Sequence, residues 1–321
     1  MTPDTLAADE PSLPAASTSP AAAAAAPAVT PSKRAVFRRR LGSALFLWAI
    51  FAGTVISGSE FCYYALIGAL GLVGLWEFYK MLDARRLPNF KLFGLTVGTL
   101  FFLGSFWFHY TRPGQPFDFE LLAVLAFLFG TFGRQLFVRT RDHSPIETMA
   151  YTLFGLLYVP LLFNFITKLI YLPAHAAHHP VGHFYVFYLI AVSKFSDMGA
   201  YLVGSLIGRH KMIPHISPSK TWEGFAGALL FSVGISYGLR ALMPARLGLL
   251  GWVDCAVMGL TLSVAAVIGD LAESIIKRST GVKDSGHTFP GIGGVLDLID
   301  SLLFTAPILY FYLRPIAEAT R

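Results

Sequence analysis

The sequence predicts an all-α polytopic membrane protein with about nine transmembrane helices. Hydrophobic residues make up 55% of the 321-residue chain and charged residues only 14%, and the mean hydropathy is +0.59. A soluble domain of this length needs more charge to cover its surface. Apolar runs long enough to cross a bilayer also recur along the chain. Together these observations exclude a soluble globular domain.

Three regions follow from the apolar runs. Residues 1–40 are predicted to form a disordered cytoplasmic tail with a basic end beside the membrane, because they are rich in Ala, Pro, Ser and Thr. Residues 41–182 are predicted to form transmembrane helices 1–5, and residues 183–321 helices 6–9, which carry most of the unusual polar residues. The predicted spans cover residues 42–57, 60–82, 91–109, 119–138, 147–171, 183–207, 221–242, 250–276 and 298–315.

The distribution of Lys and Arg predicts that the N-terminus is cytoplasmic and the C-terminus lies outside. With this orientation, 18 of the 25 Lys and Arg residues fall in cytoplasmic segments and five in outside segments. The remaining two, Lys168 and Lys194, lie within spans. Such a bias is the positive-inside pattern of membrane proteins, so the net charge of +6 is mostly a topology signal.

The sixth predicted span carries Lys194 and Asp197, three residues apart and therefore on one helix face. Charged groups inside a span are costly, which makes them candidate functional residues. A Lys–Asp ion pair that helps the helices to pack explains these two residues equally well. The sequence leaves both interpretations open.

The eighth predicted span ends with four polar residues on one face. Asp270, Glu273, Ser274 and Lys277 follow the spacing i, i+3, i+4, i+7. An intrahelical Glu273–Lys277 pair accounts for two of them. It does not account for Asp270, since a carboxylate so far inside a span requires a partner or a bound cation. We therefore expect Asp270 to be functional.

A cytoplasmic segment with the sequence SPSKTWEG precedes the seventh predicted span. Ser217 followed by Pro218 is typical of a helix N-cap and first helical residue. This prediction places Lys220 in the first helical turn, where the helix dipole disfavours a cation unless an anion lies nearby.

A second cytoplasmic segment, KDSGHTFPGIGGVLDLIDS, leads into the last predicted span. Its glycines remove side chains from the turn, so backbone N–H groups are expected to reach an anion near the helix N-terminus. Asp297 and Asp300 follow one helical turn apart. One acid there would satisfy the helix dipole, but two at this spacing indicate a further role.

The polar residues of these segments indicate nucleotide-dependent phosphoryl chemistry at a membrane surface. Carboxylate oxygens suit Mg²⁺, while lysine and arginine suit phosphate oxygens. The sequence has no GxxxxGK[ST] or HExxH motif, which excludes P-loop NTPases and HExxH metalloproteases. The candidate residues are Asp197, Asp270, Asp284, Asp297 and Asp300 with Lys220, Lys277, Arg278 and Lys283.

Three segments resemble the signatures of phosphatidate cytidylyltransferases, also called CDP-diacylglycerol synthases. They are DMGAYLVGSLIGRHKM, SPSKTWEG and ESIIKRSTGVKDSGHTFPGIGGVLDLIDS, in the family's order and spacing. Together they span residues 197–301, about a third of the chain. Two positions depart from the family pattern: Ile292 replaces a histidine and Leu298 replaces an arginine.

The resemblance implies a multi-pass enzyme of the cell inner (plasma) membrane with its active site on the cytoplasmic side. Its reaction would condense CTP with phosphatidic acid to give CDP-diacylglycerol and pyrophosphate. The implied cofactor is Mg²⁺, with K⁺ as a candidate second cation. The expected partners are CTP, phosphatidic acid and the lipid bilayer, with a homodimer as the candidate assembly and no nucleic acid.

The resemblance also assigns roles to residues. Asp270 and Asp297 would bind Mg²⁺, and Asp197, Asp284 and Asp300 would support them or bind a second cation. The basic residues would neutralise the CTP phosphates and the departing pyrophosphate. The implied catalytic residues are Lys220, Lys277, Arg278, Lys283 and Asp284. The implied substrate-binding residues are Ser217, Glu223, Ser274, Gly293 and Gly294.

Three alternatives stay open at this point. A CTP-dependent lipid kinase of the polyprenol type would transfer the γ-phosphate and release CDP instead of pyrophosphate. A cation-coupled transporter would use Asp197 and Asp270 along its path, although the inverted repeat common in such proteins is not apparent. A catalytically inactive homologue would serve as a binding or scaffold protein, which the departures at Ile292 and Leu298 keep open.

Overall fold

The computed structural model describes residues 59–112, 119–138, 144–172, 182–286, 288–289 and 293–319, together with positions 42, 46, 49, 50, 53, 54 and 57. The predicted tail, residues 1–40, lies outside the described residues, and so does most of the first predicted span. Both therefore stay predictions.

Eight helices in the described part of the chain are long and apolar enough to cross a membrane, which confirms an all-α polytopic membrane protein. Each coincides closely with one of the last eight predicted spans. The orientation of the termini and the division at residue 182 stay predictions.

The elements are α2 (Glu60–Ala84), α3 (Lys91–Thr111), α4 (Phe119–Phe137), α5 (Pro145–Leu156), the π-helical turn η1 (Leu157–Leu161), α6 (Phe165–Ile170), α7 (Gly182–Ile207), β1 (Lys211–Ile213), β2 (Ser217–Thr221), α8 (Trp222–Leu242), α9 (Trp252–Ser279) and α10 (Val295–Ala319). The fourth of the eight spans consists of α5, η1 and α6.

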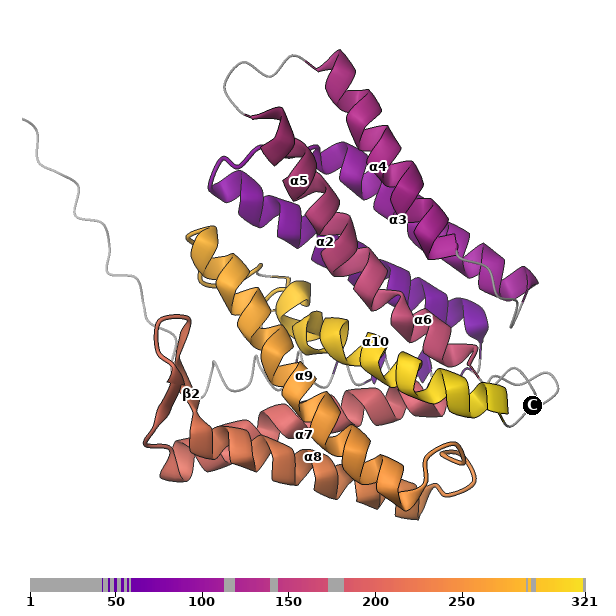
Figure 1. Cartoon of the computed structure of the whole chain (residues 1–321), viewed down its shortest axis with the longest axis vertical. Coiled ribbons are helices and arrows are strands. Elements are labelled where there is room, and N and C mark those ends of the chain that lie inside the picture. The colour runs from indigo at the N-terminus through magenta and orange to yellow at the C-terminus, as the bar shows by residue number, and fades with distance from the viewer. Residues whose placement is uncertain are drawn as a thin grey trace, which may run out of the picture.

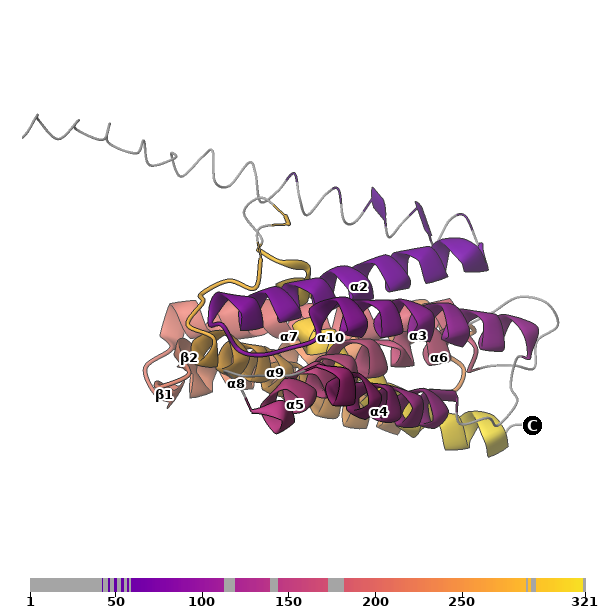
Figure 2. The same cartoon turned by 90° about the horizontal axis from the view of Figure 1, so that it is seen from above.

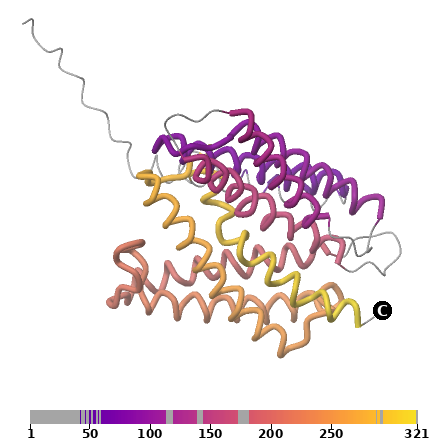
Figure 3. The backbone as a smooth tube through the Cα atoms, turned by 45° about the horizontal axis from the view of Figure 1, so that its top comes forward, coloured from indigo at the N-terminus to yellow at the C-terminus, as the bar shows by residue number. Residues whose placement is uncertain are grey.

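Helix α10 lies at the centre of the bundle. It contacts α7 and α9 on one side and α2 and α6 on the other. Figures 1 and 3 show it running between these two groups of helices. Its side chains Leu296, Ile299 and Leu303 are almost completely buried. Polar residues on α10 are consequently placed where both groups of helices can reach them.

The strands β1 and β2 form a small antiparallel hairpin between α7 and α8. Seen from above, the hairpin lies at the end of the bundle where α2 finishes (Figure 2). We call this end of the molecule the hairpin end.

The predicted start of α8 is wrong. Ser217 and Pro218 belong to β2 and are not the N-cap and first residue of a helix. Helix α8 begins at Trp222 behind the N-cap Thr221, whose hydroxyl accepts a hydrogen bond from the Gly224 N–H at 3.1 Å. The sequence pattern missed this start because pairing with β1 is a non-local interaction, and threonine is itself a good N-cap. Lys220 therefore lies in a strand, outside the first helical turn.

Helices α7 and α8 pack side by side through glycines (Figure 1). A Cβ atom on Gly199 would lie 2.6 Å from the carbonyl oxygen of Gly227, and one on Gly227 would lie 2.5 Å from Cβ of Val203. Small residues at such a crossing let two backbones approach closely within a membrane. The approach brings Asp197 of α7 close to the strand that carries Lys220.

We expect Gly227→Val to destabilise the protein, because the added side chain would overlap Val203 and the α7 backbone. Overpacking of this kind costs about 1–3 kcal/mol, which lowers the apparent Tm by roughly 2–10 °C in a thermal melt of detergent-purified protein.

The matched control is Gly234→Val on the same helix, where an added Cβ would meet no atom within 4 Å. Equal melting temperatures for the two variants would contradict the assigned helix contact.

Candidate active site

The hairpin is fixed at its base by Glu223, at the start of α8. Its carboxylate accepts hydrogen bonds from the backbone N–H groups of Arg209 and His210, at 3.1 and 3.2 Å, and contacts the His210 ring at 2.6 Å. The Trp222 N–H also donates to the His210 carbonyl at 2.9 Å. These bonds hold both strands against α8 and so restrict where Lys220 can lie.

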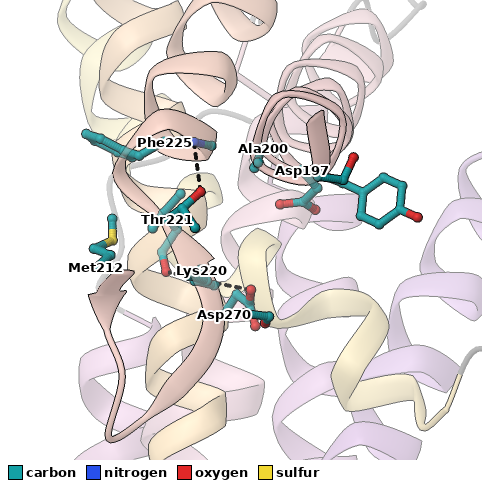
Figure 4. A pocket seen from close by; sticks show the side chains of 13 residues that line it. Asp197, Ala200, Met212, Lys220, Thr221, Phe225 and Asp270 are labelled. Carbon is teal, nitrogen blue, oxygen red and sulfur yellow. Dashed lines mark hydrogen bonds and ion pairs between the residues drawn. The ribbon is translucent and has the colours of Figure 1, made fainter. Parts of the chain in front are cut away.

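Lys220 forms an ion pair with Asp270 of α9. Its Nζ lies 2.6 Å from Asp270 Oδ2 and donates to the Val267 carbonyl at 3.3 Å. Figure 4 shows the two side chains meeting beside Asp197. The sequence predicted that Asp270 needs a partner or a bound cation, and the structure supplies a lysine from a segment that is remote along the chain.

Lys194 connects α7 to α10. Its Nζ lies 3.6 Å from Asp197 Oδ2, which confirms the Lys–Asp pair that the sequence left open. The same Nζ donates to the Leu298 carbonyl at 3.1 Å and to Ser301 Oγ at 3.4 Å. Asp197 also interacts electrostatically with Lys220 and Asp270, so the pair belongs to the same polar region.

Three carboxylates converge between α9 and α10. One oxygen from each of Asp270, Glu273 and Asp300 lies within 4.8 Å of the others. Glu273 is only 1% exposed and Asp300 6% exposed. Glu273 Oε1 is buried and has no hydrogen-bond partner among the described residues. Like charges so close together in a water-poor site repel one another, and an uncompensated buried oxygen is costly. The donor set therefore fits a hard cation such as Mg²⁺.

Lys277 joins this cluster to Asp297. Its Nζ lies 2.7 Å from Glu273 Oε2 and 2.8 Å from Asp297 Oδ1. The Glu273–Lys277 pair expected within the helix is confirmed, but the lysine serves α10 as well. Since Asp297 lies in the first turn of α10 and Lys277 in the last turn of α9, this single ammonium group links the two helices at the hairpin end.

The glycine-rich turn before α10 differs from the sequence prediction. Its N–H groups were expected to be available to an anion, but at least three at this helix start have protein partners. The Gly294 N–H donates to Asp297 Oδ2 at 2.8 Å, the Leu296 N–H to Glu77 Oε2 at 2.8 Å and the Asp297 N–H to Ser285 Oγ at 3.3 Å. A helix N-terminus needs acceptors, and here the chain itself supplies them.

The remaining predicted site residues differ in how far their side chains are buried. Arg278, Lys283 and Asp284 are exposed, and their side chains form no hydrogen bond or ion pair with another described residue. Ser274, one turn from Asp270 on α9, is half-buried. Ser217 lies in β2 beside Ser219, with the two hydroxyl oxygens 3.5 Å apart. Gly293 and Gly294 lie directly before α10, and Ile292 lies outside the described residues.

A cavity of about 410 Å³ opens beside the Lys220–Asp270 pair. Figure 4 shows Asp197, Lys220 and Asp270 pointing into it from α7, β2 and α9. Its other walls are largely apolar and include Phe225 and Val267. The cavity therefore presents charge on one side and hydrocarbon on the other.

Two residues at this site were missed by the sequence analysis. Glu273 had been explained by its pair with Lys277, although its spacing from Asp270 already placed it on the same face. Glu77 of α2 had been overlooked because it stands alone in an apolar run of the N-terminal half. A lone carboxylate inside a predicted span was the available signal for it.

Comparisons with known proteins match nearly the whole chain. A family model described as the cytidylyltransferase family matches residues 38–316. A phosphatidate cytidylyltransferase of Bacillus subtilis is 31% identical over 284 residues, covering 88% of this chain and 97% of the relative. One of Haemophilus influenzae is 30% identical over 298 residues, covering 86% and 99%. One of Staphylococcus aureus is 41% identical over 128 residues, covering 40% and 48%.

We expect Lys277→Met to destabilise the protein strongly. The change would leave the buried Glu273 and the half-buried Asp297 without their shared cation. Breaking one side of a buried ion pair costs about 3–5 kcal/mol. The measurement is a thermal melt of detergent-purified protein in buffer containing EDTA, which prevents divalent cations from replacing the lysine.

Lys283→Met is the control, because this lysine is exposed and unpaired among the described residues. A Tm for Lys277→Met as high as that of the control would contradict the role of Lys277 as a link between α9 and α10.

Proposed function

Because this chain belongs to the cytidylyltransferase family, we propose that it condenses CTP with phosphatidic acid, giving CDP-diacylglycerol and pyrophosphate in phospholipid biosynthesis. The observation that carries the proposal is similarity to phosphatidate cytidylyltransferases over 88% and 86% of the chain. The eight membrane-crossing helices suit a lipid substrate. No observation favours the lipid kinase, the transporter or the inactive homologue.

The proposed reaction needs little help from a general base. A phosphate oxygen of phosphatidic acid attacks the α-phosphorus of CTP, and the bond from that phosphorus to the β-phosphate oxygen breaks. Pyrophosphate leaves with the electron pair. The nucleophile is already an anion, so the main barrier is to bring two anions together in the right geometry. Cations and rigid positioning are what this reaction demands from the protein.

Asp270, Glu273 and Asp300 support a divalent cation site, with Asp297 adjoining it through Lys277. Mg²⁺ bound there would neutralise phosphate oxygens of the nucleotide. Asp297 remains a proposed ligand of this cation, as the resemblance implied. Asp197 lies close enough to interact with Asp270 and Asp300 and would support a second cation, for which K⁺ is the candidate.

The basic residues divide into two sets by their surroundings. Lys220 and Lys277 are half-buried and paired with carboxylates, so they would hold phosphate oxygens at the cluster itself. Arg278 and Lys283, with Asp284, are exposed and would meet the nucleotide at the solvent side. Ser217, Glu223, Ser274, Gly293 and Gly294 stay the proposed substrate-binding set; among them Glu223 would act by holding the hairpin.

The cavity suggests how the two substrates would share the site. Its charged side would receive phosphate groups, and its apolar side would receive the lipid, whose acyl chains would enter sideways from the bilayer. We place the protein in the inner membrane with the hairpin end in the cytoplasm, where CTP is found. A homodimer stays the candidate assembly.

The experiment that tests this function uses purified protein in mixed micelles with phosphatidic acid, Mg²⁺ and CTP labelled in the cytosine ring. We expect the label to enter the lipid fraction while pyrophosphate appears, and EDTA to abolish both. We expect Asp270→Asn and Asp297→Asn each to remove turnover while the protein stays folded, because each removes a charge from the proposed cation site.

Asp83→Asn is the control, since Asp83 pairs with Lys91 at an exposed position of α2 away from the cluster. Release of CDP with no lipid-linked cytosine label would indicate the kinase instead. Full turnover in Asp270→Asn or Asp297→Asn would overturn the cation assignment of that residue.

A further inference from the structure

Glu77 is a carboxylate in an unusual environment. It lies on α2, in the N-terminal half of the chain, and its side chain is completely buried. It forms no ion pair with another described residue. A carboxylate removed from water without a cation is costly unless several hydrogen bonds stabilise it. Its position therefore requires a specific set of donors.

The donors come from the segment that leads into α10. Glu77 Oε2 accepts the Leu296 N–H at 2.8 Å, and Oε1 accepts the Thr288 hydroxyl at 2.5 Å. Leu296 is in the first turn of α10, where N–H groups lack intrahelical acceptors and the helix dipole favours a negative charge. Helix α2 thus supplies a capping carboxylate to a helix more than two hundred residues later.

Glycines let the segment approach this carboxylate. A Cβ atom on Gly286 would lie 2.3 Å from Glu77 Oε1, and all three nearest atoms to it would belong to Glu77. A Cβ atom on Gly294 would lie 2.5 Å from Glu77 Oε2. A side chain at Gly286 would overlap Glu77, and one at Gly294 would overlap both Glu77 and Ser285 Oγ, which would lie 2.2 Å from the added Cβ. Glycine is needed at positions 286 and 294 because the segment packs closely around the carboxylate of Glu77.

The same segment orients Asp297. Ser285 Oγ accepts the Asp297 N–H, and the Gly294 N–H donates to Asp297 Oδ2, which leaves Oδ1 directed at Lys277. Glu77 therefore acts on the cation cluster indirectly, because it bonds Leu296, the residue directly before Asp297, and packs closely against Gly294.

We propose that Glu77 is a positioning residue of the active site, which anchors the segment before α10 to α2 and so holds Asp297 in place for cation and nucleotide binding. This role rests on the proposed function for its effect on turnover. The anchor itself is a structural statement that can be tested without any substrate.

The test uses the full chain in detergent with the variants Glu77→Ala and Glu77→Gln. Hydrogen–deuterium exchange is followed in peptides containing the Leu296 amide, and turnover is titrated with Mg²⁺. In Glu77→Ala we expect faster exchange at Leu296 and a Mg²⁺ requirement raised about 10- to 100-fold, as for other residues that orient metal ligands. In Glu77→Gln we expect values near those of the wild type, because the amide can still accept from Leu296 and bond Thr288.

Tyr79→Phe is the matched control. It lies on the same helix and removes one buried hydrogen bond, from the Tyr79 hydroxyl to the Thr152 carbonyl at 2.8 Å, without touching the segment. Unchanged exchange at Leu296 in Glu77→Ala would overturn the proposal. So would an equal shift in the Mg²⁺ requirement of Tyr79→Phe, since that would indicate a general loss of stability.

A second pair of variants keeps the test valid if Glu77→Ala does not fold. Gly286→Ala should raise exchange at Leu296 in the wild-type background, where its methyl group would collide with Glu77. In the Glu77→Gln background the methyl group still collides with the side chain at position 77, so Gly286→Ala should raise exchange at Leu296 there too. In a folded Glu77→Ala background the collision disappears, so the effects of Gly286→Ala and Glu77→Ala on this exchange should be non-additive. Wild-type exchange at Leu296 in Gly286→Ala would overturn the anchor. Absence of turnover in the wild type would contradict the proposed function alone, because the exchange data do not depend on substrate.

Discussion

Several carboxylates lie close together at the end of α9 and the start of α10, and the lysines beside them stabilise this arrangement. Lys277 bonds Glu273 of α9 and Asp297 of α10, and Asp270 is held by Lys220 from the hairpin. Glu273 and Lys277 lie where water is largely excluded, so removal of Lys277 would leave the buried Glu273 without a cation. The unpartnered oxygen of Glu273 leaves this compensation incomplete within the described protein, which is the reason to expect a cation there.

Much of the architecture around the cluster can be understood as support for it. The glycine contact between α7 and α8 brings Asp197 and the strand of Lys220 together. The small hairpin directs that lysine toward α9, while α2 contributes Glu77 to the segment before α10. The N-terminal half of the chain therefore also supports the candidate site, because Glu77 of α2 contacts the segment that leads to Asp297.

The sequence predicted the helices well and the site only in part, for physical reasons. Eight of the predicted spans were found because bilayer-length apolar runs are a local property of the chain. Asp270 was identified because a deep carboxylate is anomalous by itself, and Lys277 because its spacing from Glu273 is local. The strand at Ser217 and the contact of Glu77 with Leu296 depend on pairing between distant segments, which hydropathy and spacing do not encode. Glu273 was assigned only to Lys277, although it also lies in the carboxylate cluster with Asp270 and Asp300.

Anomalous diffraction from crystals of the full chain, grown with Mn²⁺ and a non-hydrolysable CTP analogue, would locate the cation. Mn²⁺ accepts the same carboxylate ligands as Mg²⁺ and can be located by its own scattering. We expect a manganese peak bound by carboxylates of the α9–α10 cluster, with the nucleotide phosphates beside it. A bound nucleotide whose metal lies away from Asp270, Glu273, Asp297 and Asp300 would contradict this expectation.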